Sequence, residues 1–225
     1  MGFIEEIEEK SLAMRRSILV HPFVAEVGQG DLPVEKFKFY VSQDYVYLID
    51  YSRVLALAAA RAPELEMMGW FAGLLDETLN TEMDLHRSFC AEFGITTEEL
   101  EATQAAQVTL AYTSFLLKTA YQGSFGELVA SLMPCQWGYW EIGEHLLAKG
   151  RPIQAPLYSK WIDMYSSEGF RDLAKHLRLL TGRLGDAAGT VERSAMETAY
   201  VASLRLESQF WDMAYNVESG SLASS

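Results

Sequence analysis

The chain has 225 residues and a formal net charge of −13, from 31 acidic and 18 basic side chains. So acidic a surface repels phosphate backbones and anionic lipid headgroups, which argues against a protein that binds nucleic acid or membrane surfaces. Because 49% of the residues are hydrophobic, the chain can bury a substantial core, and general disorder is excluded.

The amino-terminal sequence MGFIEEIEEK is acidic where a secretion signal needs a basic start and an apolar run. The longest apolar stretches, such as VLALAAA, are much shorter than a membrane span. We therefore expect a cytoplasmic protein whose two cysteines, Cys90 and Cys135, stay reduced. Cys90 has apolar neighbours and is assigned to the core.

Apolar residues recur three and four positions apart almost throughout, and no alternating run between turn residues indicates a strand. The pattern predicts an all-α protein, with one helical bundle domain over residues 1–218 and a polar tail over residues 219–225. Proline, glycine and capping signals predict helices over residues 3–20, 33–61 and 63–94, a short helix after 96, one ending near 123, then 124–150, a short helix before 165, one ending near 182–185, and 188–215.

The segment SLMPCQWGYWEIGEHLL places Pro134 inside a predicted helix, beside Cys135. Because residues four apart share a helix face, Cys135 and Tyr139 point the same way, and Gly138 would allow a close approach beside them. Pro134 either kinks this helix or starts a new one, whose first turn would favour a Cys135 thiolate. A further alternative is that Cys135 is simply a buried core residue.

Two other segments combine one carboxylate with aromatic rings. SQDYVYLIDYSR places Asp44 and Tyr47 on one helix face, and LRLESQFWDMAY places Glu207 in a stripe with Phe210. If these acids are buried, they need partners or a purpose. The alternatives are an exposed Asp44 and a solvated Glu207.

A thiol, two carboxylates and several aromatic rings on different helices suit a flat, nitrogen-rich ring as ligand, because rings can sandwich it and carboxylates can bind its edge. Tyrosines elsewhere in the pattern are either core residues or contacts to such a ligand. The candidate site residues are Asp44, Tyr47, Tyr112, Cys135, Tyr139, Tyr165, Glu207 and Phe210.

An acid and a histidine lie four residues apart at three places, which raises the question of a metal site. Such pairs are common on helix surfaces, and the Glu-x-x-His spacing of four-helix di-iron sites is absent. We therefore interpret them as surface pairs and predict neither a metal nor a cofactor. The pairs are Glu82 and His86, Glu141 and His145, and Asp172 and His176.

The segments PCQWGYWEIG, SQDYVYLIDYSR and ESQFW resemble the three signature segments of the TenA, or thiaminase II, family, in its cysteine-containing branch. The matching positions extend over nearly the whole chain. The resemblance implies a haem-oxygenase-like helical fold, usually assembled as a homotetramer. It also implies a hydrolase that acts on a small-molecule aminopyrimidine in thiamin salvage, with thiamin itself a possible second substrate.

The resemblance implies a role for each candidate residue. Cys135 would be the nucleophile that adds to the pyrimidine ring. Glu207 would be the acid or base near the ring nitrogen. Asp44 would bind the ring nitrogen and the amino edge of the ring. Two rival interpretations are a di-iron oxygenase of the same fold and a non-catalytic protein that binds a pyrimidine or thiamin. The residues that would line or orient the pocket are Tyr47, Tyr112, Tyr139, Tyr165 and Phe210.

Overall fold

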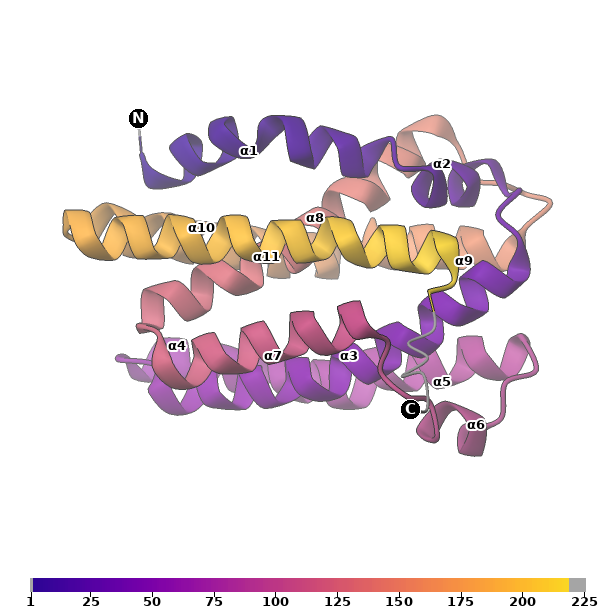
Figure 1. Ribbon diagram of the computed structural model, residues 1–225, viewed down its shortest axis with the longest axis horizontal. Helices are drawn as coiled ribbons and strands as arrows, with labels where there is room; N and C mark the ends of the chain where they lie inside the picture. Colours follow the sequence, from indigo (N-terminus) through magenta and orange to yellow (C-terminus); the bar gives the residue numbers. More distant parts are fainter. Residues whose placement is uncertain (1, 219–225) are drawn as a thin grey trace, which may run out of the picture. The chain divides into compact units, whose positions relative to one another are not determined.

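The structure, a computed structural model, describes residues 2–218, and its regular elements over that range are helices, which confirms the all-α prediction. The predicted tail, residues 219–225, lies outside the described residues. In chain order the elements are α1 (Phe3–Leu19), α2 (Pro22–Gln29), α3 (Val34–Arg61), α4 (Leu65–Glu77), the π-helix η1 (Thr78–Glu82), α5 (Met83–Glu92), α6 (Thr97–Glu101), α7 (Gln107–Gln122), α8 (Phe125–Lys149), α9 (Pro156–Tyr165), α10 (Glu168–Ala187) and α11 (Thr190–Asn216) (Figure 1).

The helices group into two compact units. Unit 1 comprises Met1–Leu32 and Lys118–Ser208, and unit 2 comprises Pro33–Leu117 and the segment that begins at Gln209. The boundaries fall within α7 and α11, so each of these two helices contributes residues to both units. A single domain over residues 1–218 stays a prediction.

In unit 1, α8 packs against α9 and α10, and α1 lies alongside α10 (Figure 1). Ion pairs fix α1 to this group. The guanidinium of Arg178 donates two hydrogen bonds of 2.7 Å to the carboxylate of Glu8, and Arg15 donates to Glu141. Such bidentate pairs fix orientation as well as distance, so α1 is held in register against both α8 and α10.

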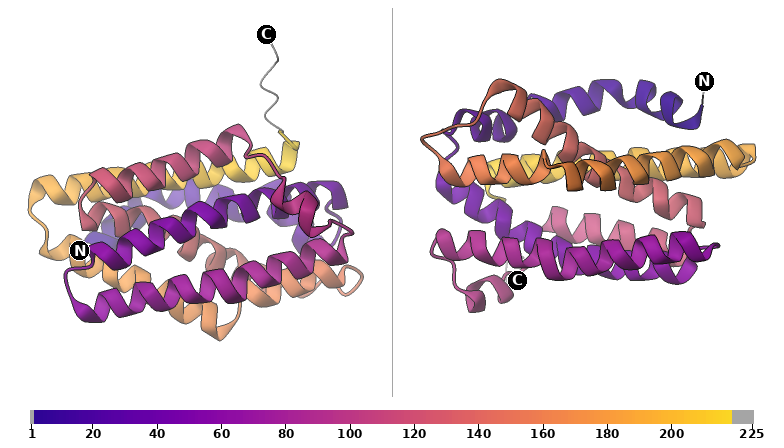
Figure 2. Two further views of the ribbon diagram at one scale, coloured as in Figure 1. Left: turned by 90° about the horizontal axis from the view of Figure 1, so that it is seen from below. Right: turned by 180° about the vertical axis from the view of Figure 1, so that it is seen from behind.

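In unit 2, α3 packs against both α4 and α5. Figure 2 shows the run from α4 to α5 as one unbroken helical rod beside α3. The rod contains the π-helical turn Thr78–Glu82, in which the amide of Met83 donates to the carbonyl of Thr78 five residues earlier. The predicted helix 63–94 is therefore confirmed in extent, but it contains one extra residue in a turn that the periodicity did not reveal.

Proline had a different effect at the start of the chain from the one predicted. Pro22 follows the end of α1, as expected, but it also occupies the first turn of α2, a helix that the sequence analysis missed. Proline suits that position because the first amides of a helix have no partner within it. The two predicted capping boxes, which begin at Thr96 and Ser124, are both confirmed.

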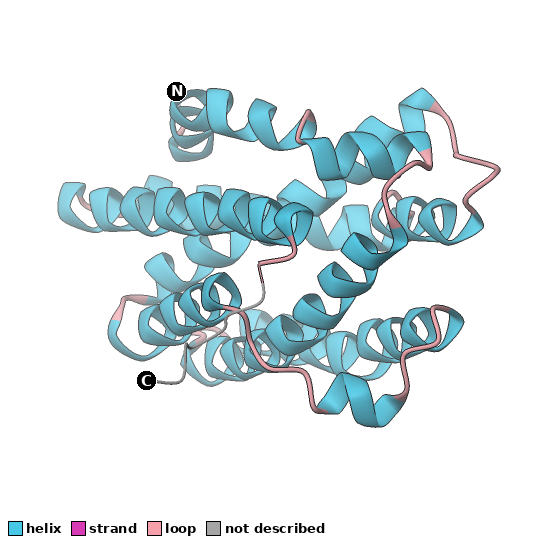
Figure 3. Ribbon diagram, turned by 45° about the vertical axis from the view of Figure 1, so that its right-hand side comes forward, coloured by secondary structure: helices cyan, strands magenta, loops and turns pink. Residues whose placement is uncertain are grey.

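Figure 3 shows helices and connecting loops throughout residues 2–218, without a strand. Within that range no helix combines the length and the apolar character that crossing a membrane requires.

Candidate functional site

Four candidate residues belong to unit 2, and three of them form one aromatic cluster. The ring of Tyr47 on α3 lies 5.0 Å from that of Tyr112 on α7 and 6.1 Å from that of Phe210 on α11, measured between centroids. Tyr51, one turn further along α3, stacks on Tyr47 at 5.7 Å. The helix faces predicted from sequence spacing are therefore buried faces, and they bring these rings together.

Asp44, the fourth candidate in unit 2, is buried with 5% of its surface exposed, so the alternative of an exposed acid is wrong. Its Oδ2 lies 2.6 Å from Nε2 of His86 on α5, and Nδ1 of His86 lies 2.9 Å from the backbone carbonyl of Glu82. His86 is itself 2% exposed. The prediction that Glu82 and His86 form a surface pair is therefore wrong.

The electrostatics of this cluster are unusual. Burial disfavours the charged imidazole, but the hydrogen bond to Asp44 and the charges of Asp44 and Glu82 outweigh it and raise the pKa of His86 to about 9. Burial raises the pKa of Glu82 to about 7, with a further increase from Asp44 and Glu77 and a decrease from His86. His86 contacts the candidate residue Asp44, but it was not among the predicted site residues, although its spacing from Glu82 had marked it for attention.

Gln43, next to Asp44, fixes α3 to the start of α7. Its Oε1 accepts hydrogen bonds from the amide of Ala106 at 2.8 Å and from Oγ1 of Thr109 at 2.7 Å, and its Nε2 donates to the carbonyl of Gln104 at 3.0 Å. Tyr47 lies one turn beyond Gln43, and Tyr112 lies three residues beyond Thr109. These bonds therefore set the register in which the two tyrosines meet.

The other four candidates belong to unit 1. Tyr139 on α8 lies 4.6 Å, between ring centroids, from Tyr165 at the end of α9, and both rings pack on Trp161. A close approach of the backbones allows this contact, because a Cβ at Gly143 would lie 2.6 Å from the carbonyl carbon of Tyr165. Gly138 differs from Gly143: apart from its chain neighbours and the backbone of its own helix, no described atom lies within 4 Å of a Cβ built there, so the close approach that the sequence suggested beside Cys135 and Tyr139 stays a prediction.

Cys135 lies one turn before Tyr139, inside a helix that continues through Pro134 from Phe125 to Lys149. The interpretation that Pro134 starts a new helix is therefore wrong, and with it the argument that a helix amino terminus favours the thiolate. Cys135 is partly exposed rather than fully buried, unlike Cys90.

The turn of α8 that precedes Pro134 accepts a hydrogen bond from another helix. Proline removes one amide donor from the helix and pushes the preceding turn aside. In that turn the carbonyl of Ser131 accepts a hydrogen bond of 2.6 Å from Oγ of Ser203 on α11, a fully buried contact. Ser203 therefore holds the turn of α8 that precedes Cys135. No local sequence pattern marks Ser203 for this role.

Glu207, on α11, is 3% exposed. The alternative of a solvated surface carboxylate is therefore wrong. A buried carboxylate needs compensating contacts or a chemical purpose, which agrees with the acid or base role that the family resemblance implies.

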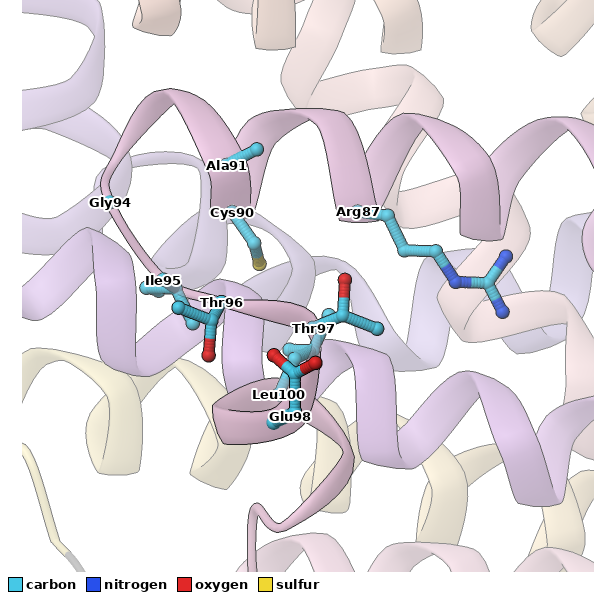
Figure 4. A pocket seen from close by; sticks show the side chains of 9 residues that line it. All are labelled: Arg87, Cys90, Ala91, Gly94, Ile95, Thr96, Thr97, Glu98 and Leu100. Atoms are coloured by element: carbon cyan, nitrogen blue, oxygen red, sulfur yellow. The ribbon is translucent and has the colours of Figure 1, made fainter.

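A pocket of about 410 Å³ lies in unit 2 between α5 and α6, lined by side chains between Arg87 and Leu100 (Figure 4). Cys90 points from α5 toward α6, and burial, with the charge of Asp44, raises the pKa of its thiol to about 11. Cys90 is 1% exposed, so its assignment to the core is confirmed. None of the candidate site residues lines this pocket.

The remaining acids of the predicted acid and histidine pairs have arginine partners. Glu141 accepts from Arg15, and Asp172 accepts from Arg171 at 3.0 Å. These contacts agree with structural and surface roles for the two acids.

Comparison with known proteins gives consistent results. The model of the TENA/THI-4/PQQC family matches residues 8–217. An aminopyrimidine aminohydrolase of Halalkalibacterium halodurans is 42% identical over 216 residues, which cover 96% of each chain. An aminopyrimidine aminohydrolase of Bacillus subtilis is 36% identical, covering 97% of this chain and 92% of its own.

Solved structures agree in fold. A TenA homologue protein from P. horikoshii OT3 matches with a TM-score of 0.87 at 30% identity, covering 96% of this chain and 99% of its own. A domain of unknown function with a heme oxygenase-like fold from Shewanella denitrificans matches with a TM-score of 0.76 at 16% identity, covering 95% and 92%, which confirms the predicted fold class. Because the family model spans most of the chain, and the relative from H. halodurans is 42% identical over nearly its full length, the chain belongs to the TENA/THI-4/PQQC family.

Proposed function

We propose that this chain is an aminopyrimidine aminohydrolase of thiamin salvage. The reaction converts 4-amino-5-aminomethyl-2-methylpyrimidine and water into the hydroxymethylpyrimidine and ammonia. The observation that carries the proposal is the 42% identity, over 96% of both chains, to an enzyme of that name. Buried carboxylates and aromatic clusters at the candidate positions support it.

The proposed mechanism is covalent. The Cys135 thiolate adds to the pyrimidine ring, and the electron pair gained by the ring expels ammonia from the exocyclic CH2. Water then adds to that carbon, and the ring returns the electron pair as the thiolate leaves. Dividing one displacement into such steps lowers the barrier of each.

The other candidate residues would assist these steps. Glu207 donates a proton to the ring nitrogen during thiolate addition and recovers it on thiolate release. Asp44 holds the amino edge of the ring. The residues that line or orient the pocket are Tyr47, Tyr112, Tyr139, Tyr165 and Phe210.

Ammonia release from the aminopyrimidine tests the proposal. We expect turnover by the purified protein and nearly complete loss in Cys135→Ser, while Cys90→Ala, the matched change at the buried core cysteine, keeps its activity. Unchanged turnover in Cys135→Ser would reject the nucleophile. Binding of the aminopyrimidine without ammonia release by the wild type would instead favour a non-catalytic pyrimidine-binding protein.

We also propose that the protein acts in the cytoplasm as a homotetramer with a single domain over residues 1–218, and that thiamin is a second substrate. Exposed apolar side chains on α4, Leu65 at 82% and Met68 at 40%, would suit burial between subunits. Light scattering on the purified protein should give four times the mass of 25.3 kDa, and a monomeric mass would reject the tetramer.

Cell fractionation tests the compartment, and thiazole release from thiamin tests the second substrate.

A further inference from the structure

The contact between Asp44 and His86 fixes the number of protons that the pair holds. A backbone carbonyl can only accept a hydrogen bond, so Nδ1 of His86, at 2.9 Å from the carbonyl of Glu82, must carry a proton. The 2.6 Å contact between Nε2 and Oδ2 of Asp44 then holds one further proton. The pair is therefore either an imidazolium beside a carboxylate or a neutral imidazole beside a carboxylic acid.

The π-helical turn explains why the imidazole meets Asp44. An α-helix advances about 100° per residue, so one extra residue in η1 rotates every later side chain by that angle. Through this rotation both α4 and α5 present buried residues to α3, and His86 faces the helix that carries Asp44. Turns of this kind occur frequently at functional sites.

The charged groups around the pair decide which form it takes. Within unit 2, Glu82 from η1 acts on the pair and Glu77 from α4 acts on Glu82, while the charge of Asp44 in turn raises the pKa of the Cys90 thiol on α5. The acids among them stabilise a positive imidazole and disfavour a second negative charge. The pKa of His86 rises to about 9, so the imidazolium beside a carboxylate is the form present at neutral pH.

We propose that His86 is a positioning residue for the aminopyrimidine reaction: its Nε2 proton holds Oδ2 of Asp44, so that Oδ1 accepts a hydrogen bond from the exocyclic amino group of the substrate. This inference rests on the proposed function. The carboxylate form matters because an amino group donates hydrogen bonds and needs an acceptor that is ionised and correctly aimed.

Titration of the histidines by nuclear magnetic resonance tests the proton arrangement without any substrate. The chain has four histidines, and His86→Gln identifies the signal of His86. We expect that imidazole to stay doubly protonated up to a pH of about 9. A signal that titrates at or below the ordinary pKa of about 6.5 would overturn the inference, whatever the activity of the protein.

Kinetics test the positioning role. His86→Leu should lower kcat/KM for the aminopyrimidine roughly 10- to 100-fold, because Oδ2 of Asp44 loses the N–H donor that holds it. His86→Gln keeps an N–H donor and should recover part of the rate. His176→Gln, at an exposed histidine on α10, is the matched control and should behave as wild type.

A double-mutant cycle separates this role from a structural one. If His86 acts through Asp44, His86→Leu should cause little further loss in an Asp44→Asn background. Additive losses, or no recovery of the rate in His86→Gln, would overturn the positioning role. If the wild type does not turn over the aminopyrimidine, the proposed function fails and the substrate contact of Asp44 fails with it, whereas a failed titration alone leaves the proposed function intact.

Discussion

At the scale of single residues, Glu207 combines burial with a carboxyl group, which is the kind of group that the proposed reaction needs. We expect Glu207→Gln to lower kcat by a factor of about 10² to 10⁴, because an amide of the same shape cannot transfer the proton. Ammonia release under substrate saturation measures the effect. Asp212→Asn, an exposed acid on the same helix, is the control and should keep wild-type activity. A Glu207→Gln enzyme within threefold of wild type would remove Glu207 from the mechanism.

Sequence spacing predicted which residues share a helix face, but it could not show which face is buried. Asp44 and Glu207 had both exposed and buried interpretations, and only the packed structure decides between them. His86 was misassigned for a related reason: its spacing from Glu82 suggested a side-chain pair, whereas the imidazole bonds to the carbonyl of Glu82 and to a carboxylate 42 positions away in the chain. Contacts between distant residues leave no periodic signal.

At the scale of helices, removing the extra residue of the π-helical turn tests whether that residue directs His86 toward Asp44. Deleting Thr81, an exposed residue of η1, should convert the turn to regular α-helix and rotate His86 by about 100° away from Asp44. We expect the histidine signal with the raised pKa to disappear and kcat/KM to fall at least as far as in His86→Leu. Thr81→Ala keeps the length of the turn and should preserve both. A deletion variant with an unchanged His86 titration would contradict this account of η1.

A second test at this scale concerns the contact between α8 and the end of α9. Gly143→Ala places a Cβ 2.6 Å from the carbonyl carbon of Tyr165, so the two helices must separate. We expect a loss of about 1–3 kcal/mol in the free energy of unfolding, together with a lower kcat/KM as Tyr165 moves from Tyr139. Urea denaturation measures the first and ammonia release the second.

The matched control for that change is Gly169→Ala, at an exposed glycine of α10 where a Cβ meets no described atom within 4 Å. It should leave the free energy of unfolding unchanged or raise it by up to about 1 kcal/mol, because alanine favours helix over glycine. Equal effects of the two substitutions would contradict the close-approach explanation.

Helix positions were largely predictable, because capping boxes, glycines and apolar spacing are local signals. Prolines were harder to interpret. Pro22 both follows α1 and opens α2, and Pro134 lies within a continuous helix. Pro134 removes the amide donor for the carbonyl of Ala130, and the same turn of α8 accepts a hydrogen bond from Ser203 at the carbonyl of Ser131. A donor on a distant helix cannot be located from local sequence.

At the scale of the whole molecule, the buried groups around Asp44 make the stability of the fold depend on pH. The folded state raises the pKa of Glu82 from 4.5 to about 7 and that of His86 from 6.5 to about 9. In both cases the folded protein binds the proton more tightly than the unfolded chain, so stability falls as pH rises through each interval. His145, whose pKa is lowered by burial and by Lys149, acts in the opposite direction below pH 6.5.

We therefore expect the free energy of unfolding, measured by urea denaturation, to fall between about pH 5 and pH 9. Glu82→Gln should flatten the part of the curve between about pH 4.5 and 7, because an amide has no proton to lose. His86→Gln should flatten the part between about pH 6.5 and 9. The matched control is Glu98→Gln, at an exposed acid of α6, which should leave the shape of the curve unchanged. If the Glu82 variant and wild type give parallel curves, the carboxyl of Glu82 is ionised throughout that interval, and it then contributes a fixed negative charge that holds His86 in its protonated form.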